Sequence, residues 1–127
     1  MAAETVDPSA AVECRGLAQI IDRIGDKWTV MVVGHLSTGT LRFNELMRRI
    51  PGISHRMLTL TLRGLERDGL VRRTAFASIP PRVDYALTDL GSSLTEPLTL
   101  LARWAGAHRA DIETAQRDYD AIEDRSI

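Results

Sequence analysis

The sequence predicts a mainly α-helical fold with one small β-hairpin, and three patterns of residues predict it. Apolar residues recur every three or four positions over several stretches, as they do on one face of an α-helix. Pro51-Gly52 separates two such stretches by a turn signal. Residues 70–76 and 83–87 have the composition of strands, with Ser78 to Arg82 between them as a hairpin tip. Helix, turn, helix and hairpin in this order are the layout of a winged helix-turn-helix.

The size and charge of the chain agree with one domain that has a basic middle. The length of 127 residues fits a single domain. We expect a flexible arm over 1–13, a core domain over 14–108 and a charged helical extension over 109–127. The formal net charge is −1, but residues 42–82 hold nine arginines and three acidic residues, a local charge of +6. Concentrated positive charge is typical of phosphate binding, although a solvated surface rich in arginine has the same composition.

The expected cellular setting follows from the single cysteine and from the lack of targeting signals. Cys14 is the only cysteine, so no disulfide can form within one chain. The amino terminus lacks the basic start and apolar run of a signal peptide. The longest apolar run, near Val30 to Val33, is too short to span a bilayer. We therefore expect a cytoplasmic protein that has no contact with a membrane.

The first part of the chain is expected to form three helices and a short strand. The stripe over 15–24 predicts the first helix, which Gly25 ends. Asp26 is then placed to cap a second helix, Trp28 to Leu36. Because this second helix is apolar nearly all round, it should lie at the buried centre of the domain. A short strand over 40–42 and a third helix over 43–50 complete this part.

The remaining elements are a capped fourth helix, the hairpin and a long last helix. Ser54 is a good N-cap for the fourth helix, and Asp68-Gly69 closes it. Thr88 is expected to cap a last helix that runs to about His108. Pro97 lies inside that pattern, so we expect it to kink the helix or to leave a carbonyl unpaired. The charged extension beyond is expected to be frayed.

The fourth helix has one apolar edge and one cationic edge. At about 100° per residue, Leu58, Leu62 and Leu65 fall on one side. The opposite side and its flank hold His55, Arg56, Thr59, Leu60, Arg63 and Arg67. The first turn would enter a major groove, where Ser54 and its neighbours reach base edges. The later Arg63 and Arg67 would contact phosphate, which positions the protein without reading sequence.

Three residues of this helix also have plainer interpretations. His55 is equally consistent with an ordinary surface histidine, and Arg56 with a surface ion pair. Leu60 either contacts a thymine methyl group or packs on the neighbouring helix. The hypothesis of DNA contact therefore depends on the whole cationic edge.

Two arginines outside this helix complete the expected DNA contacts. Arg42 lies just before the third helix. Arg82 follows Pro80-Pro81, and two prolines stiffen the hairpin tip. A stiff tip that ends in arginine suits insertion into a minor groove. The alternative for Arg82 is a salt bridge to Asp84 or another carboxylate.

Short motifs follow one another in a fixed order along residues 14–105. They are Cys14, Ile24-Gly25-Asp26-Lys27-Trp28, Arg42-Phe43-Asn44-Glu45-Leu46, Ile50-Pro51-Gly52-Ile53-Ser54, Met57-Leu58-Thr59, Leu65-Glu66-Arg67-Asp68-Gly69-Leu70-Val71, Pro80-Pro81-Arg82-Val83-Asp84-Tyr85 and Leu87-Thr88-Asp89-Leu90-Gly91. In this order the chain resembles the HxlR family of MarR-like winged helix-turn-helix regulators of bacterial transcription.

The resemblance implies a homodimer that binds double-stranded operator DNA. It places the recognition helix at Ser54 to Arg67 and the wing at Phe76 to Val83, with dimerisation through the first and last helices. Leu60 departs from the polar residue expected at its position. No metal-ligand cluster, glycine-rich phosphate loop or Ser-His-Asp order is visible in the sequence. We therefore expect neither a cofactor nor catalytic residues.

Cys14 matches the amino-terminal cysteine of the family, which in some members senses oxidants or electrophiles. Arg15 beside it and an expected place at the start of a helix favour a reactive thiol, whereas Glu13 opposes it. A half-buried structural cysteine is the alternative. An oxidant or an unknown small molecule therefore stays open as an effector.

The favoured function is a sequence-specific DNA-binding transcription regulator that acts as a homodimer, with repression as the expected mode. The alternative is a winged-helix module whose arginines contact an acidic protein partner. The two differ in how binding responds to salt. A thiol enzyme that uses Cys14 is disfavoured, because His35, His55 and His108 are the only histidines and fall on three different elements.

Overall fold

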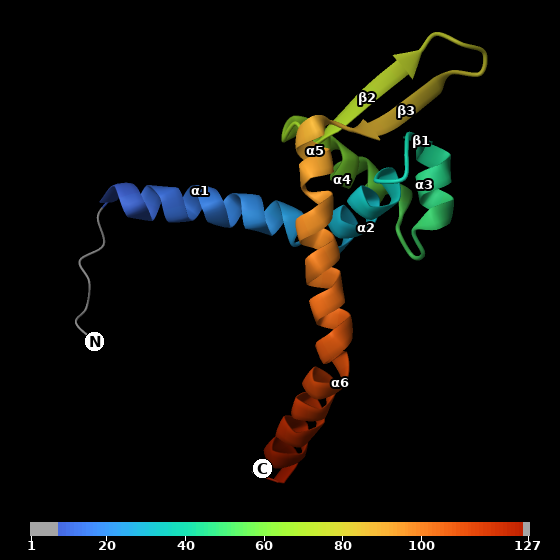
Figure 1. The fold of residues 1–127 in the computed structure, drawn as a ribbon. Helices are drawn as coiled ribbons and strands as arrows, with labels where there is room; N and C mark the ends of the chain where they lie inside the picture. The colour runs from blue at the N-terminus through green and yellow to red at the C-terminus, as the bar shows by residue number, and fades with distance from the viewer. Residues whose placement is uncertain (1–7, 126–127) are drawn as a thin grey trace.

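The computed structural model describes residues 8–125 and shows a small winged helix-turn-helix body with two long helices that leave it (Figure 1). The elements in chain order are α1 (Pro8–Ile24), α2 (Lys27–Leu36), β1 (Leu41–Arg42), α3 (Phe43–Arg49), α4 (His55–Arg67), β2 (Val71–Phe76), β3 (Arg82–Leu87), α5 (Asp89–Ser93) and α6 (Thr95–Arg125). The predicted mainly helical fold with a β-hairpin wing is confirmed.

The core of the body lies between α2, α3, α4 and the sheet. Val32 and Val33 of α2 are buried, as the apolar composition of that helix predicts. The helix is capped by Asp26, whose carboxylate accepts hydrogen bonds from the backbone N–H groups of Trp28 at 2.9 Å and Thr29 at 3.2 Å. The predicted apolar stripe of α4 is confirmed. Leu58, Leu62 and Leu65 are all buried.

The sheet has three antiparallel strands in the order β1-β3-β2. The hairpin of β2 and β3 is paired from Val71↔Leu87 to Phe76↔Arg82. The short β1 joins its other side, with Arg42 opposite Asp84. The far end of the hairpin extends beyond the helices as the wing (Figure 1).

The long last helix that the sequence predicts is interrupted close to Pro97, so it is two helices, α5 and α6. Thr88 does cap a helix, since its Oγ1 accepts from the N–H of Gly91 at 3.1 Å, but that helix is the short α5. The chain turns at Leu94, and Pro97 then lies in the first turn of α6. Proline has no N–H to donate to the carbonyl of Ser93, four residues earlier, and the helix is interrupted between the two, which agrees with the disruption expected of Pro97.

The carboxyl-terminal extension does not fray where the sequence suggested. Helix α6 continues through residue 109 to Arg125. Arg109 Nε donates to Glu113 Oε1 at 2.9 Å, one turn along the same face. Pairs at this spacing stabilise an exposed helix modestly.

The amino-terminal boundary also differs from the expectation. Helix α1 begins at Pro8, so the described part of the expected arm is helical, and residues 1–7 lie outside the described residues. Proline is well tolerated at a first helical position because its missing N–H would have no acceptor there. Cys14 is therefore well inside α1 and not at its start.

Helices α1 and α6 carry large apolar side chains that the other described residues leave exposed. Both helices extend away from the body (Figure 1). Their exposed apolar residues are Leu17, Ile20, Ile21, Leu100, Leu101, Trp104, Ile112, Tyr119 and Ile122. Apolar surface on this scale usually marks an interface. Among residues 8–125, no helix is both long enough and apolar enough to cross a membrane.

Candidate nucleic-acid interface

The amino-terminal end of α4 is built by a glycine turn and a serine cap. Gly52 has φ +80°, a left-handed conformation that glycine adopts without strain, so the chain can turn sharply after α3. Ser54 Oγ then accepts from the backbone N–H of Met57 at 3.0 Å. The cap fixes where α4 begins, and with it which side chains stand in the first turn.

The exposed edge of α4 carries the side chains that the helical spacing predicts. Arg56, Arg63 and Arg67 are exposed. Leu60 is 46% exposed and therefore lies on the surface. Thr59 is half-buried, and its hydroxyl donates to the carbonyl of His55 at 2.9 Å.

His55 differs from an isolated surface histidine, because its ring packs on Phe43 at the start of α3. The ring centroids are 4.7 Å apart and the planes are tilted by 52°. The side chain nevertheless stays exposed. Phe43 therefore sets the orientation of His55 beside the first turn of α4.

A hollow of about 480 Å³ lies on the surface between α4 and the sheet. It is lined by Phe43, His55, Thr59, Leu62, Arg63, Glu66, Arg73, Val83 and Tyr85. Arg73 was not among the predicted contacts, yet it stands opposite Tyr85 in the ladder and shares this hollow with Arg63. The alternation of side chains along β2 was the signal that could have identified it, since Arg73 lies on the same face as the buried Val71.

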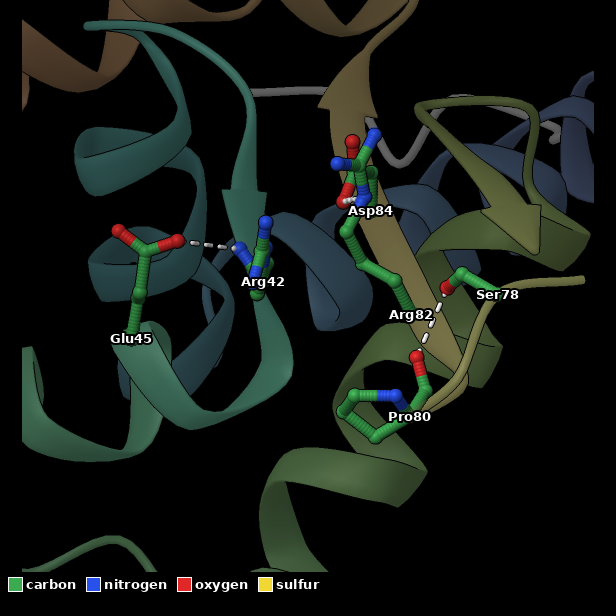
Figure 2. A network of polar contacts seen from close by, with 6 residues as sticks. All are labelled: Arg42, Glu45, Ser78, Pro80, Arg82 and Asp84. Atoms are coloured by element: carbon green, nitrogen blue, oxygen red, sulfur yellow. Dashed lines mark hydrogen bonds and ion pairs between the residues drawn. The ribbon is translucent and has the colours of Figure 1, made fainter. Parts of the chain in front are cut away.

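Arg82 is held against its own hairpin. Its Nε lies 3.2 Å from Asp84 Oδ1, and Figure 2 shows the two side chains side by side on β3. The two atoms are within ion-pair distance but do not form a hydrogen bond. The guanidinium carbon also lies 4.2 Å from the centre of the Phe76 ring. The salt bridge to Asp84 that the sequence offered as the alternative is therefore present.

Arg42 lies beside this pair. It stands directly opposite Asp84 in the ladder, so the two arginines and the carboxylate share one face of the sheet. The backbone N–H of Arg42 donates to Glu45 Oε1 at 3.1 Å, which starts α3 (Figure 2). At the tip, Ser78 Oγ donates to the carbonyl of Pro80 at 2.8 Å. The hairpin thus carries positive charge on a locally constrained backbone.

Arg67 is separated from the first turn of α4 by the length of the helix. It lines a groove of about 1040 Å³ that runs between α1 and the segment from the end of α4 to the end of α5. The structure therefore brings Arg63 and Arg73 together at the hollow between α4 and the sheet, leaves Arg56 exposed in the first turn of α4, and places Arg67 at the end of α4 near α1.

Cys14 is exposed on α1, so the alternative of a half-buried cysteine does not hold. The suggested effect of a helix start on this thiol is also wrong. Six residues of α1 precede Cys14, and the field of a helix terminus falls off within the first turn. The described residues contain no group of three or more metal-ligating side chains.

Known proteins share this arrangement. The family model described as HxlR-like helix-turn-helix matches residues 23–113. An uncharacterized HTH-type transcriptional regulator of Methanothermobacter thermautotrophicus is 46% identical over 92 residues, 70% of each chain. YybR, an HTH-type transcriptional regulator of Bacillus subtilis, is 40% identical over 105 residues, 83% of each chain. The solved structure of the redox regulator HypR in its reduced form is 38% identical, with a TM-score of 0.72 over 78% of this chain and 98% of HypR. The chain therefore belongs to the HxlR-like helix-turn-helix family and is a transcriptional regulator of the helix-turn-helix type.

Proposed function

We propose that the protein binds a specific operator sequence in double-stranded DNA as a homodimer and represses transcription there. The observation that supports this best is the exposed edge of α4. A capped helix start presents polar and cationic side chains to solvent, while the opposite edge is buried in the core. A helix of this kind fits the major groove of B-DNA. We call α4 the recognition helix from here on.

The first turns of the recognition helix read bases in this proposal. Ser54, His55, Arg56 and Thr59 lie nearest the groove floor, and Leu60 meets a thymine methyl group. Arginine can form a bidentate contact with guanine, which discriminates by roughly 1–3 kcal/mol against other bases. Thr59 acts as an acceptor here, because its own hydrogen is engaged by the carbonyl of His55.

The remaining arginines contact the backbone and the adjacent minor groove. Arg63 and Arg67 meet phosphates along the recognition helix, and Arg73 adds positive charge beside Arg63. Arg42 and Arg82 serve the wing. Asp84 and Phe76 restrict the side chain of Arg82 before DNA arrives, so that less conformational entropy is lost on binding.

The uncovered apolar surfaces of α1 and α6 support the homodimer. Ile20 of α1 is 60% exposed and Leu101 of α6 is 56% exposed. A second copy that covers both helices would bury them. Two recognition helices related by a twofold axis would then meet half-sites about one turn of DNA apart, 34–36 Å, or a multiple of it.

Oxidation of Cys14 is the proposed signal. The thiol is exposed on α1, the helix that also carries the proposed dimer surface. Similarity to HypR, a redox regulator, supports the same idea. A thiol can be oxidised by peroxide to a sulfenic acid, which then condenses with the thiol of a second copy to a disulfide and releases water.

Selection from a random duplex library tests the DNA-binding proposal. The protein should enrich one palindromic site and run as a dimer by light scattering at micromolar concentration. Its affinity for that site should fall linearly with salt on a log–log plot. A monomeric mass would refute the homodimer. Failure to enrich any site, together with binding to an acidic protein, would favour the alternative of a protein-interaction module.

A further inference from the structure

One ion pair connects α1 directly to the end of the recognition helix. Arg23, one residue before the end of α1, donates from Nε to Asp68 Oδ2 at 2.7 Å. Asp68 is the C-cap of the recognition helix, and its backbone N–H donates to the carbonyl of Gly64 at 3.0 Å. The contact spans 45 residues of sequence. Arg23 therefore contacts the residue at which the recognition helix ends.

Gly64 provides the space in which Arg23 lies. The residue is buried within the recognition helix, and a Cβ added there would overlap the guanidinium of Arg23. Its backbone is ordinary helix, without the positive φ that makes glycine necessary elsewhere. Glycine is a poor helix former, and alanine is the best. A side chain at this position would therefore have to displace the guanidinium of Arg23.

Of the α1 side chains that the structure describes, residues 14–24, Arg23 alone forms an ion pair with the body. The helix leaves the body from its carboxyl-terminal end (Figure 1). Its side chains Leu17, Ile20 and Ile21 are between 52% and 60% exposed. A partner that covers these residues would therefore exert any force on the body through the short region around Arg23.

We propose that Arg23 is a positioning residue that fixes the direction of α1 relative to the recognition helix. A second copy that packs on α1 would then set the orientation of the recognition helix on DNA through the contact that Arg23 makes. This inference rests on the proposed function. Arg23 is not assigned a DNA contact, because its guanidinium is paired with Asp68 and lies against the buried Gly64, away from the exposed edge that carries Arg63.

The pair should matter more for geometry than for stability. The side chains of Arg23 and Asp68 are 35% and 31% exposed, so water screens their attraction. The placement of the guanidinium, however, is restricted on two sides, by the carboxylate and by the backbone at Gly64. Loss of Arg23 should leave the body folded while α1 samples more directions.

A distance measurement between spin labels tests the inference without DNA. One label occupies Cys14 on α1, and the other a cysteine introduced by Glu66→Cys on the recognition helix. Labelled chains are mixed with an excess of unlabelled Cys14→Ser chains, so that only distances within one chain are recorded. The distribution should be narrow in the parent and in Arg15→Ala, which removes the same charge from α1. Arg23→Ala should broaden it.

Gly64→Ala separates positioning from a general effect on the helix. By helix propensity alone, alanine should make the recognition helix more ordered. On our inference, the alanine displaces Arg23, so the distribution of distances between the two labels should broaden. Thermal unfolding should still show a folded protein. A narrow distribution in both Arg23→Ala and Gly64→Ala would overturn the inference.

Binding to the selected DNA site gives a functional readout. Arg23→Ala should lower affinity for the palindromic duplex roughly tenfold, a typical coupling between two sites, and change affinity for a duplex with one half-site by less than about twofold. Equal losses on both duplexes would overturn the role in dimer geometry. If the parent protein enriches no site, the proposed function fails, and the label distances still decide whether Arg23 fixes α1.

Discussion

Replacing Arg63 by alanine should change how DNA binding responds to salt. Each phosphate that a protein neutralises contributes about 0.9 to the slope of log affinity against log salt, because condensed cations are released. Arg63 is exposed on the recognition helix, and a homodimer contains it twice. Arg63→Ala should therefore reduce the slope by about 1.8. A fourfold rise in salt would then weaken the parent roughly 12-fold more than the variant.

Fluorescence anisotropy of a labelled duplex at a series of salt concentrations measures this slope. Arg103→Ala is the matched control, because it removes an exposed arginine from α6, outside the proposed interface. Its slope should equal that of the parent. A decrease of about 0.9 for Arg63→Ala would show that only one chain contacts DNA. An unchanged slope would refute the assignment of Arg63 to phosphate.

Three further predictions use the same assays and unfolding experiments. Arg56→Ala should weaken specific binding and relax sequence preference, whereas Arg67→Ala should weaken all duplexes about equally; equal losses for both variants would contradict the base-reading role of Arg56. Peroxide should alter the DNA affinity of the parent and leave Cys14→Ser unaffected, and an equal response of the two proteins would exclude a redox switch at that thiol. Gly91→Ala should destabilise the fold by about 1–3 kcal/mol, because its Cβ would overlap a neighbouring backbone carbonyl. Gly34→Ala is the control, because no atom lies within 4 Å of its added Cβ, and it should stabilise the fold by about 0.5–1 kcal/mol. Urea unfolding at fixed protein concentration measures both variants, and two effects of the same sign would contradict the packing at Gly91.

The parts of the fold that depend on local rules could be predicted from the sequence. Capping by Asp26, Ser54 and Thr88 needs only a side-chain oxygen near the first free N–H groups of a helix, and all three caps are present. The buried and exposed edges of the recognition helix follow from a period of 3.6 residues. The hairpin likewise follows from two β-rich segments and the turn between them.

Features that depend on contacts distant in sequence could not be predicted in the same way. Pro97 indicated a disruption of the last helix, but the position of the break at Leu94 becomes visible only in the folded chain. Arg23 looks like an ordinary surface residue until Gly64 and Asp68 are brought next to it.

The length of α6 determines how strongly its acidic carboxyl-terminal half repels DNA bound at the recognition helix. With 31 residues, the helix is about 46 Å long, and its acidic far half extends away from the sheet (Figure 1). Electrostatic interactions decay over about 8 Å in physiological salt, so the repulsion between these carboxylates and a duplex bound at the recognition helix is screened. In 0.01 M salt the decay length grows to about 30 Å, and the acidic end begins to repel the same duplex. In dilute buffer, the plot of log affinity against log salt concentration should therefore fall below its linear extrapolation. Most DNA-binding proteins bind most tightly under these conditions.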